Sequence, residues 1–317
     1  MTPTLRAHHL DDLRRSGLSD ATIAALGFYS VTRQEAGKVL TFDPGSDCMA
    51  IPFPSVDGQK PFLRFKPDTP LTIPGQERAA KYLSPKGADN RLYIPPATRS
   101  LLQNADAAII ITEGEKKGAK ADQEGFACVG LTGVECWRQK PRDAQGRKVD
   151  DADSVPIPDL DLVTWRKRTV FLVFDSDIVR KPEVRRALWA LRGELVRRGA
   201  IVHVVYLPDG KDGAKVGLDD FLVGHGVDAL RKLLDDAPVL DWQQRVRDVL
   251  DTPEGQGRDD LIRELLVDLT READALTRDR VRKTLVDGKA LTARTFDDLA
   301  KECEPKGSGS SEPGQVE

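Results

Sequence analysis

The sequence has few cysteines and no long apolar run. Its 317 residues include four cysteines, at positions 48, 128, 136 and 303, and no two of them form a Cys-x-x-Cys pair. The pair His8-His9 has no cysteine near it in sequence, so we do not predict a zinc site and expect reduced cytosolic thiols. No apolar stretch approaches the roughly 20 residues that span a bilayer. Met1–His9 lacks the apolar segment of a signal peptide, so we expect a cytoplasmic protein with no membrane partner.

The sequence also lacks an excess of positive charge. Its 48 Lys and Arg residues face 51 Asp and Glu residues, which gives a formal net charge of −3. Any contact with nucleic acid must therefore come from local basic patches and not from the field of the whole protein. The chain contains no Gly-x-x-x-x-Gly-Lys-Ser/Thr segment, which excludes a P-loop within it. Its length is typical of about two domains.

Two short apolar segments end abruptly in carboxylates. The first is Ala107–Thr112, followed by Glu113. The second is Thr169–Phe174, followed by Asp175 and Asp177. Continuous apolar runs of this length predict strands that are buried on both faces, as in a parallel sheet. Because ligands of open parallel sheets bind beyond the carboxyl ends of the strands, we expect the three carboxylates to converge, and their oxygens suit Mg²⁺.

These strand ends resemble the Toprim domain, which bacterial-type DNA primases, topoisomerases and some nucleases share. The motifs are Ile-Thr-Glu113-Gly114 and Val-Phe-Asp175-Ser176-Asp177, with a βα unit between them. The resemblance implies an α/β fold with a Toprim-like parallel sheet flanked by helices. It also implies that Glu113, Asp175 and Asp177 are catalytic and bind Mg²⁺ or Mn²⁺, and Glu113 is either a ligand or a general acid or base.

The next acidic position of the site is open to three candidates. The chain has Gly-Lys-Asp212 but not the Pro-Asp that follows in primases of the Toprim type. It has Leu-Asp219-Asp220-Phe-Leu instead, which resembles an uncharacterised Toprim-like family of phage and mobile-element proteins. Ser16-Gly-Leu-Ser and Glu113-Gly-Glu-Lys-Lys also fit that family. We take Asp219 as the further metal ligand over Asp212 and Asp220, although Asp219 is equally a candidate N-cap of the next helix.

The segment before the first of these strands is rich in short β-like pieces. Pro and Gly separate them, as in a small irregular β unit. The predicted pieces are Val39–Phe42, Met49–Phe53, Phe62–Phe65 and Leu92–Ile94. In Phe62-Leu-Arg64-Phe-Lys66 apolar and basic residues alternate, so one face of that strand is predicted to be cationic.

Five cations are the candidates for binding nucleotides or DNA. Lys81-Tyr-Leu-Ser-Pro and Arg91-Leu-Tyr resemble the segment that precedes the Toprim domain in bacterial-type primases, where a basic subdomain faces the metal site. The predicted helix Glu115–Glu124 begins at the site, so its N-terminus and Lys117 suit an anionic group. The five candidates are Arg64, Lys66, Lys81, Arg91 and Lys117.

The chain is predicted to have five parts. Its last helical part reads as helices at Trp242–Leu250, Asp259–Glu272, Arg278–Val286 and Thr295–Lys301. A polar insertion at Arg138–Pro158 is predicted to be a solvated loop or a nucleic-acid contact. The parts are a helical segment (1–36), a small basic α+β subdomain (37–104), the Toprim-like catalytic domain (105–238), a helical accessory region (239–304) and a disordered tail (305–317).

The function that these features predict is a Mg²⁺-dependent, primase-like nucleotidyltransferase of a phage or other mobile element. It would act on single-stranded DNA with nucleoside triphosphates, beside a separately encoded replicative helicase. Two alternatives stay open: a Toprim-type metal-dependent nuclease, and a non-catalytic module that binds DNA or a helicase. Strand cleavage as in topoisomerases needs a catalytic tyrosine from a separate large domain, and the chain has only four tyrosines and no such domain.

Overall fold

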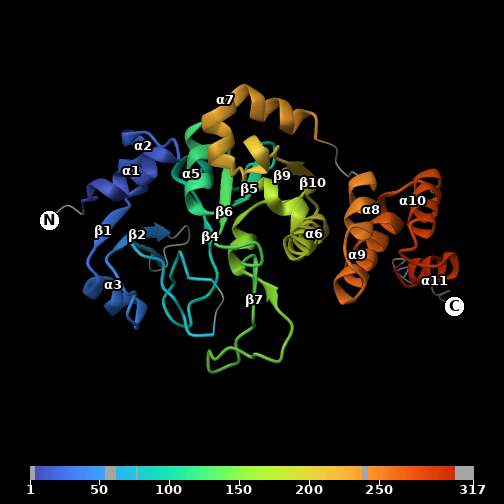
Figure 1. Cartoon of the computed structure of the whole chain (residues 1–317), viewed down its shortest axis with the longest axis horizontal. Helices are drawn as coiled ribbons and strands as arrows, with labels where there is room; N and C mark the ends of the chain where they lie inside the picture. Colours follow the sequence, from blue (N-terminus) through green and yellow to red (C-terminus); the bar gives the residue numbers. More distant parts are fainter. Residues whose placement is uncertain (1–3, 54–61, 76–77, 238–241, 304–317) are drawn as a thin grey trace, which may run out of the picture. The chain divides into compact units, whose positions relative to one another are not determined.

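The computed structural model describes residues 4–53, 62–75, 78–237 and 242–303. Among these residues, none of the helices combines the length and apolar character needed to cross a bilayer. The chain forms two compact units, one of Met1–Ile178 with Glu194–Leu240 and one of Val179–Gly193 with Asp241–Glu317. Each unit is described by itself below (Figure 1). The five predicted parts remain a prediction.

A five-stranded sheet is the centre of the first unit. Its strands are β4 (Leu92–Tyr93), β5 (Ile109–Glu113), β6 (Cys128–Leu131), β9 (Thr169–Phe174) and β10 (Ile201–Tyr206). Their order is β10-β9-β5-β6-β4, with β4 antiparallel to β6 and the other neighbours parallel. The predicted α/β fold with a mainly parallel sheet is therefore confirmed, and β5 and β9 are neighbours.

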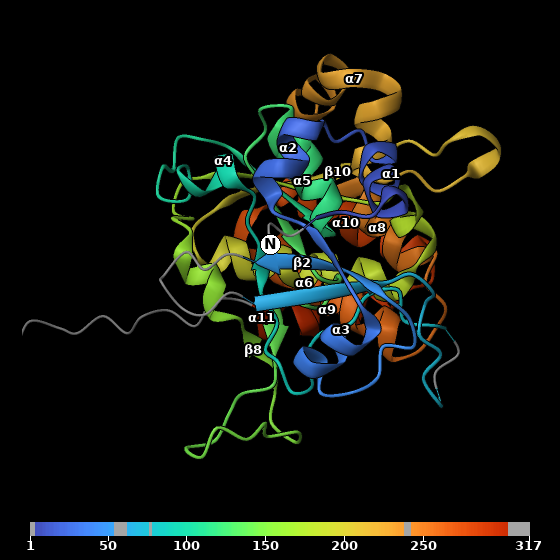
Figure 2. The same cartoon turned by 90° about the vertical axis from the view of Figure 1, so that its left-hand side faces the viewer.

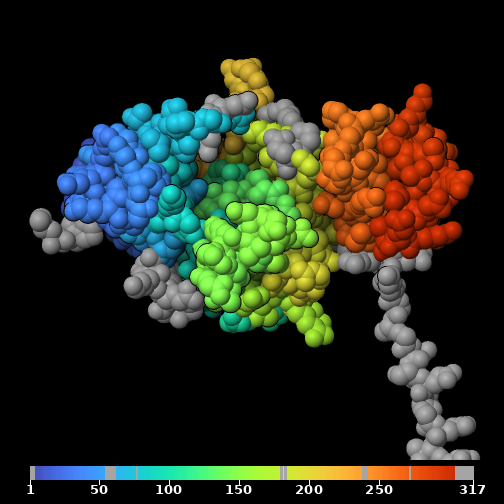
Figure 3. Space-filling view, turned by 90° about the horizontal axis from the view of Figure 1, so that it is seen from below, coloured from blue at the N-terminus to red at the C-terminus, as the bar shows by residue number. Residues whose placement is uncertain are grey.

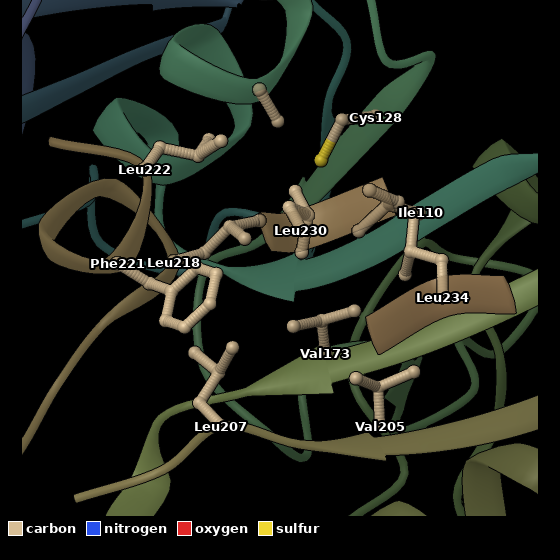
Figure 4. Close-up of a cluster of buried hydrophobic side chains, with 11 residues drawn as sticks. Ile110, Cys128, Val173, Val205, Leu207, Leu218, Phe221, Leu222, Leu230 and Leu234 are labelled. Atoms are coloured by element: carbon tan, nitrogen blue, oxygen red, sulfur yellow. The ribbon is translucent and has the colours of Figure 1, made fainter. Parts of the chain in front are cut away.

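Helices α5 (Glu115–Gln123) and α7 (Leu218–Asp235) cover one face of this sheet. Figure 4 shows leucines of α7 in one cluster with residues of four strands, among them Ile110 and Val173. Each fully buried side chain of this kind contributes about 1.5–3 kcal/mol relative to its exposed state. This core fixes the starts of α5 and α7 at the carboxyl ends of the strands.

A second, three-stranded sheet lies in the N-terminal part of the same unit. Its strands pair in the antiparallel order β1-β2-β3. The elements are α1 (Ala7–Arg15), α2 (Asp20–Leu26), β1 (Tyr29–Val31), α3 (Arg33–Leu40), β2 (Cys48–Phe53) and β3 (Phe62–Pro67). Met49 and Ile51 of β2 pack with α1 and α2, whereas Cys48 and Ala50 pack with α3. The small sheet therefore has helices on both faces (Figure 2).

Two predictions for this region are wrong. The predicted strand Val39–Phe42 is the end of α3 and the turn after it. Thr32 and Glu35 form a capping box that starts this helix, and the helical spacing buries Ala36 and Leu40, which outweighs the β propensity of Val39. Strand β4 was assigned to the N-terminal β unit, but it pairs with β6 in the central sheet.

The predicted polar insertion contains a short two-stranded ribbon. Its strands are β7 (Arg138–Gln139) and β8 (Val155–Pro156), and they pair antiparallel. The turn η1 (Pro158–Leu162) follows, and a short helix α4 (Pro96–Arg99) lies earlier in the chain. Figure 3 shows the segment of the ribbon in bright green at the surface of the first unit.

The second unit is helical, as predicted. Its helices are α8 (Trp242–Leu250), α9 (Gln256–Glu272), α10 (Ala275–Asp287) and α11 (Ala293–Cys303), together with the first part of α6 (Pro182–Arg197). Arg245 is buried, forms an ion pair with Asp268, and has its guanidinium 4.2 Å from the ring centre of Trp189. The predicted disordered tail lies outside the described residues.

Candidate functional site

A cleft of about 590 Å³ opens at the carboxyl ends of β5 and β9. Residues of β3, β5, α5, the segment after β9 and the start of α7 line it. Its cations are Arg64, Lys66, Lys81, Lys116, Lys117 and Lys215, and its carboxylates are Asp68, Glu113, Glu115, Asp175 and Asp219. Opposite charges therefore alternate over a small surface, as is typical of sites that bind phosphates together with cations.

The turn after β5 brings Glu113 and the N-terminus of α5 to this cleft. Gly114 lies in this turn with a φ of 107°, a backbone conformation that is strained for any residue that has a side chain. Its N–H donates to the carbonyl of Leu131 at 2.8 Å. On the neighbouring strand, a Cβ at Gly130 would lie 2.7 Å from the carbonyl oxygen of Gly114. Both glycines are therefore required for the close approach of this turn to β6.

Asp175 is the most enclosed carboxylate at the end of β9, with 3% of its surface exposed. Its Oδ1 accepts from Lys117 Nζ, and its Oδ2 lies 2.5 Å from Lys215 Nζ. Lys215 Nζ also lies 3.9 Å from Asp177 Oδ2. Burial by itself would lower the pKa of Lys215, but the hydrogen bond to Asp175 and the charges of Asp177 and Glu113 outweigh it and raise the pKa. Lys117 and Lys215 thus pair with the two oxygens of Asp175.

The start of α7 closes the cleft over this ion pair. A Cβ at Gly217 would lie 2.7 Å from Lys117 Cε, 2.9 Å from Asp219 Oδ1 and 3.3 Å from Asp175 Oδ1, so a larger residue would push these side chains out of their present positions. Gly217 is the N-cap residue, and its N–H donates to Asp220 Oδ2 at 3.0 Å. The alternative of Asp219 as N-cap is therefore wrong. Asp219 is 6% exposed and lines the cleft.

Arg64 of β3 is fixed against the first residue of α5. Its guanidinium forms an ion pair with Glu115, which is 1% exposed, and donates to the carbonyl of Thr132 at 2.9 Å. The guanidinium carbon also lies 4.7 Å from the ring centre of Tyr82. Burial raises the pKa of Tyr82 well above its ordinary range, and the charge of Glu115 raises this pKa further. These contacts hold one wall of the cleft in place.

Lys66 and Lys116 share the carboxylate of Asp12 from α1. The distances from Asp12 Oδ2 are 2.6 Å to Lys66 Nζ and 3.2 Å to Lys116 Nζ. Burial would raise the pKa of Asp12, but the hydrogen bond from Lys66 and the charge of Lys116 outweigh burial and lower the pKa. Asp12 therefore gathers two cations at the rim of the cleft.

The structure brings together most of the residues that the sequence indicated, but not all. Those that line the cleft are Arg64, Lys66, Lys81, Glu113, Lys117, Asp175 and Asp219. Asp177 lies beside the cleft, within reach of Lys215. Arg91 lines a different hollow, where its Nε lies 2.8 Å from Asp159 Oδ2. Asp212 and Asp220 are exposed and do not line the cleft.

Sequence reasoning missed several residues of this site: Asp12, Glu115, Lys215 and Gly217. Glu115 carried a usable signal, because a carboxylate in the first turn of a helix favours its N-terminal end. The contact of Lys215 with Asp175 had no such signal, since it joins two loops that follow different strands.

A hard divalent ion such as Mg²⁺ requires several oxygen ligands at once. Among the residues that the structure describes, one group of three His, Cys, Asp or Glu side chains has all its ligand atoms within 4.8 Å of one another, and it lies outside the strand-end carboxylates. Lysine ammonium groups occupy both oxygens of Asp175. A cation can reach Asp175 only in exchange for a lysine, and Lys215, whose side chain is 51% exposed, has room to withdraw. The ligand atoms of Glu113, Asp175 and Asp219 do not all lie within 4.8 Å of one another, so binding of an ion by all three would also require these side chains to move closer together.

Comparison with known sequences finds partial matches. Residues 99–229 match a family described as a domain of unknown function, DUF3854. An uncharacterised protein of Picosynechococcus is 31% identical over 140 residues, which cover 41% of this chain and 13% of that relative. The chain thus corresponds to a small part of a much longer relative.

Solved structures of primase domains are similar to this chain over most of its length. A DNA primase domain from Pseudomonas aeruginosa aligns with a TM-score of 0.56 and 15% identity over 93% of each chain. The zinc-binding and RNA polymerase domains of the Aquifex aeolicus primase align with a TM-score of 0.52 and 14% identity over 92% of this chain and 69% of that one. The RNA polymerase domain of the Mycobacterium tuberculosis primase DnaG, in complex with double-stranded DNA, aligns with a TM-score of 0.51 and 14% identity over 94% and 89%. The fold is similar to that of primase domains.

Proposed function

We propose that this chain is a primase-like nucleotidyltransferase that extends nucleic acid on a single-stranded DNA template from nucleoside triphosphates. One observation carries the proposal: a single cleft combines cations of β3 and α5 with carboxylates at the ends of β5 and β9. The similarity of the fold to primase domains supports it.

The cations of the cleft suit the phosphates of template and nucleotide. Lys66 of β3, Lys81 of the segment between β3 and β4, and Lys116 of α5 line it, and Lys116 and Lys117 lie in the first turn of α5. Ammonium groups and a helix N-terminus both favour phosphate oxygens. Arg64 is held by Glu115 and acts by keeping the wall of the cleft in position. Arg91 has no part in this proposal, because it lines another hollow.

Carboxylates in the cleft, with Asp177 beside it, would hold Mg²⁺ or Mn²⁺. The ligands would be Glu113, Asp175, Asp177 and Asp219. When bound, such an ion polarises the phosphorus centre and helps to align the attacking and leaving oxygens. Lys215, once released from Asp175, remains an ammonium group and is available to a phosphate oxygen.

Primer synthesis tests the proposal directly. Single-stranded DNA is incubated with labelled ribo- or deoxynucleotides and with Mg²⁺ or Mn²⁺, with the wild type beside the double variant Asp175→Asn with Asp177→Asn. We expect short labelled products from the wild type and none from the double variant. Asp212→Asn is the matched control, because it removes an exposed carboxylate outside the cleft and should leave synthesis unchanged.

Other outcomes would assign a different function. Shortened template that depends on Asp175 and Asp177 would identify a metal-dependent nuclease. DNA binding that persists in chelator, with neither synthesis nor cleavage, would identify a non-catalytic module that binds DNA or a helicase. Synthesis that survives in the double variant would show that the site is wrongly placed.

The biological setting belongs to the same proposal. Glu113-Gly-Glu-Lys-Lys and Leu-Asp219-Asp220-Phe-Leu resemble Toprim-like proteins of phages and mobile elements. We infer a cytoplasmic replication protein of such an element, which acts beside a separately encoded replicative helicase.

A further inference from the structure

Three side chains that are candidate metal ligands meet at the junction of α1 and β3. His8 and His9 lie in the first turn of α1, and Asp68 directly follows β3. One nitrogen of each ring and one oxygen of Asp68 all lie within 4.8 Å of one another. The Nε2 atoms of His9 and His8 lie 2.7 Å and 3.2 Å from the same oxygen, Asp68 Oδ1.

The ring of His9 is held in a fixed orientation. His9 is 4% exposed, and its Nδ1 lies 2.7 Å from Ser30 Oγ. Ser30 Oγ itself accepts from the backbone N–H of Arg6 at 2.8 Å. An oxygen partner on Nδ1 aims Nε2 at the ligand position, which is the usual arrangement of a metal-binding imidazole.

The group has space beside it for an ion and further ligands. A hollow of about 240 Å³ is lined by His8, His9 and Asp68, and its wall also carries the carboxylates of Asp11 and Asp12 and the cations of Arg15 and Lys66. Asp12 is held by lysines, whereas the side chain of His8 is 55% exposed and can adjust.

The distances suit a small transition-metal ion. Ligands of tetrahedral Zn²⁺ lie about 2.0–2.2 Å from the metal, and hence roughly 3.3 Å from one another. The present separations of 2.7 Å and 3.2 Å from Asp68 Oδ1 need to widen by about 0.6 Å and about 0.1 Å to reach that value. Two imidazoles with one carboxylate favour Zn²⁺ and its neighbours over Mg²⁺, which prefers oxygen alone.

We propose that His8, His9 and Asp68 bind one divalent transition-metal ion of the Zn²⁺ class, with solvent completing its coordination. The ion ties the first turn of α1 to the end of β3. Its role is to hold the N-terminal helix and the basic strand together beside the cleft. The proposal does not depend on the proposed function, because it requires binding and no catalysis.

Titration of chelator-treated protein with Zn²⁺ in a calorimeter tests this site. We expect one equivalent to bind to the wild type, and binding to weaken about tenfold or more in His8→Ala and in Asp68→Asn. His8→Ala removes an exposed side chain and leaves the buried contact of His9 with Ser30 in place, so its fold is retained. His225→Ala is the matched control, since His225 is exposed and packs beside Phe221 of α7, outside the group.

Two further readouts locate the ion. Co²⁺ should give a visible absorption band in the wild type and in His225→Ala that is lost in His8→Ala. Saturating Zn²⁺ should raise the thermal unfolding midpoint of the same two proteins and not that of His8→Ala. Equal Zn²⁺ affinity in the wild type, His8→Ala, Asp68→Asn and His225→Ala would overturn the proposal, and so would no binding by the wild type at micromolar Zn²⁺. In either case the group would be a set of hydrogen bonds between histidine and aspartate without a metal.

Discussion

Lys215→Met should strengthen the binding of Mn²⁺ in the cleft while it weakens synthesis. In the structure, Lys215 Nζ lies 2.5 Å from Asp175 Oδ2, so a metal that binds Asp175 must first break this ion pair. Methionine keeps the length of the side chain and removes the ammonium group. The variant therefore has no ion pair to break at Asp175 Oδ2, while Lys117 still holds Oδ1, and it offers one cation fewer to a phosphate.

The size of the effect follows from the exposure of the pair. Two unit charges 2.5 Å apart attract by about 1.7 kcal/mol at the dielectric constant of water, before the cost of ordering the side chain. The side chain of Lys215 is 51% exposed, and pairs of that kind are worth a net 0.2–1 kcal/mol, roughly. A gain of about 0.5–1 kcal/mol corresponds to Mn²⁺ binding that is about 2- to 5-fold tighter.

Electron paramagnetic resonance of free Mn²⁺ measures this affinity without nucleotide, because the bound ion loses its sharp signal. Lys211→Met is the matched control: it removes the same charge from an exposed position outside the cleft. We expect the control to bind Mn²⁺ like the wild type, and the difference between the variants to shrink in high salt.

Several results would contradict this reasoning. If Lys215→Met and Lys211→Met changed the affinity equally, the effect would be one of net charge and not of the ion pair. If Lys215→Met weakened Mn²⁺ binding, the lysine would support the site and not compete for it. If the wild type bound no Mn²⁺ at all, the metal ligands proposed here would be wrong.

Three other variants test the remaining walls of the cleft. Gly217→Ala should lower primer synthesis with only a small loss of stability, because its Cβ would push aside the ends of the Lys117 and Asp219 side chains. Gly224→Ala in the same helix meets nothing within 4 Å and should be neutral or slightly stabilising in urea unfolding. Glu115→Ala should cost about 3 kcal/mol in the same assay, since it leaves the largely enclosed guanidinium of Arg64 without its carboxylate. Glu135→Ala breaks an exposed pair and should cost less than about 1 kcal/mol. Asp12 has a lowered pKa in the folded protein, so its stabilising contribution is present above the ordinary value of 3.8 and is lost as the pH falls through the lower, folded value. Asp12→Asn should therefore flatten the loss of stability between pH 5.5 and 3, and an unchanged slope would contradict the assigned ion pairs.

The sequence by itself determined where most elements lie. The run Thr169–Phe174 is a strand with those bounds, and Trp242–Leu250 is a helix with those bounds. Both predictions have a local cause. The spacing of the apolar residues along the sequence corresponds to the side of the element that becomes buried, or to both sides of it. The pairing of β5 with β9 also followed, because each apolar run is buried on both faces and must lie inside a parallel sheet.

Elements whose local signals conflict were not predictable in this way. Val39 has a high β propensity, but the cap at Thr32 and the burial of Leu40 made its segment a helix. Strand β4 has only two residues, so its sequence carries no information about which sheet it joins. The structure that such a segment adopts depends on which part of the remaining fold it packs against.

The residues of the candidate site also divide into those that the sequence could predict and those that only the tertiary structure brought together. Glu113 and Asp175 could be named because a carboxylate at the end of a buried strand must face the strand-end edge of the sheet. The lysines that hold Asp175, the pair of Arg64 with Glu115, and the meeting of His9 with Asp68 were decided only by the tertiary structure. In each of these contacts the partners lie far apart in the chain, and packing of separate elements, not any local periodicity, sets the distance between their charged atoms.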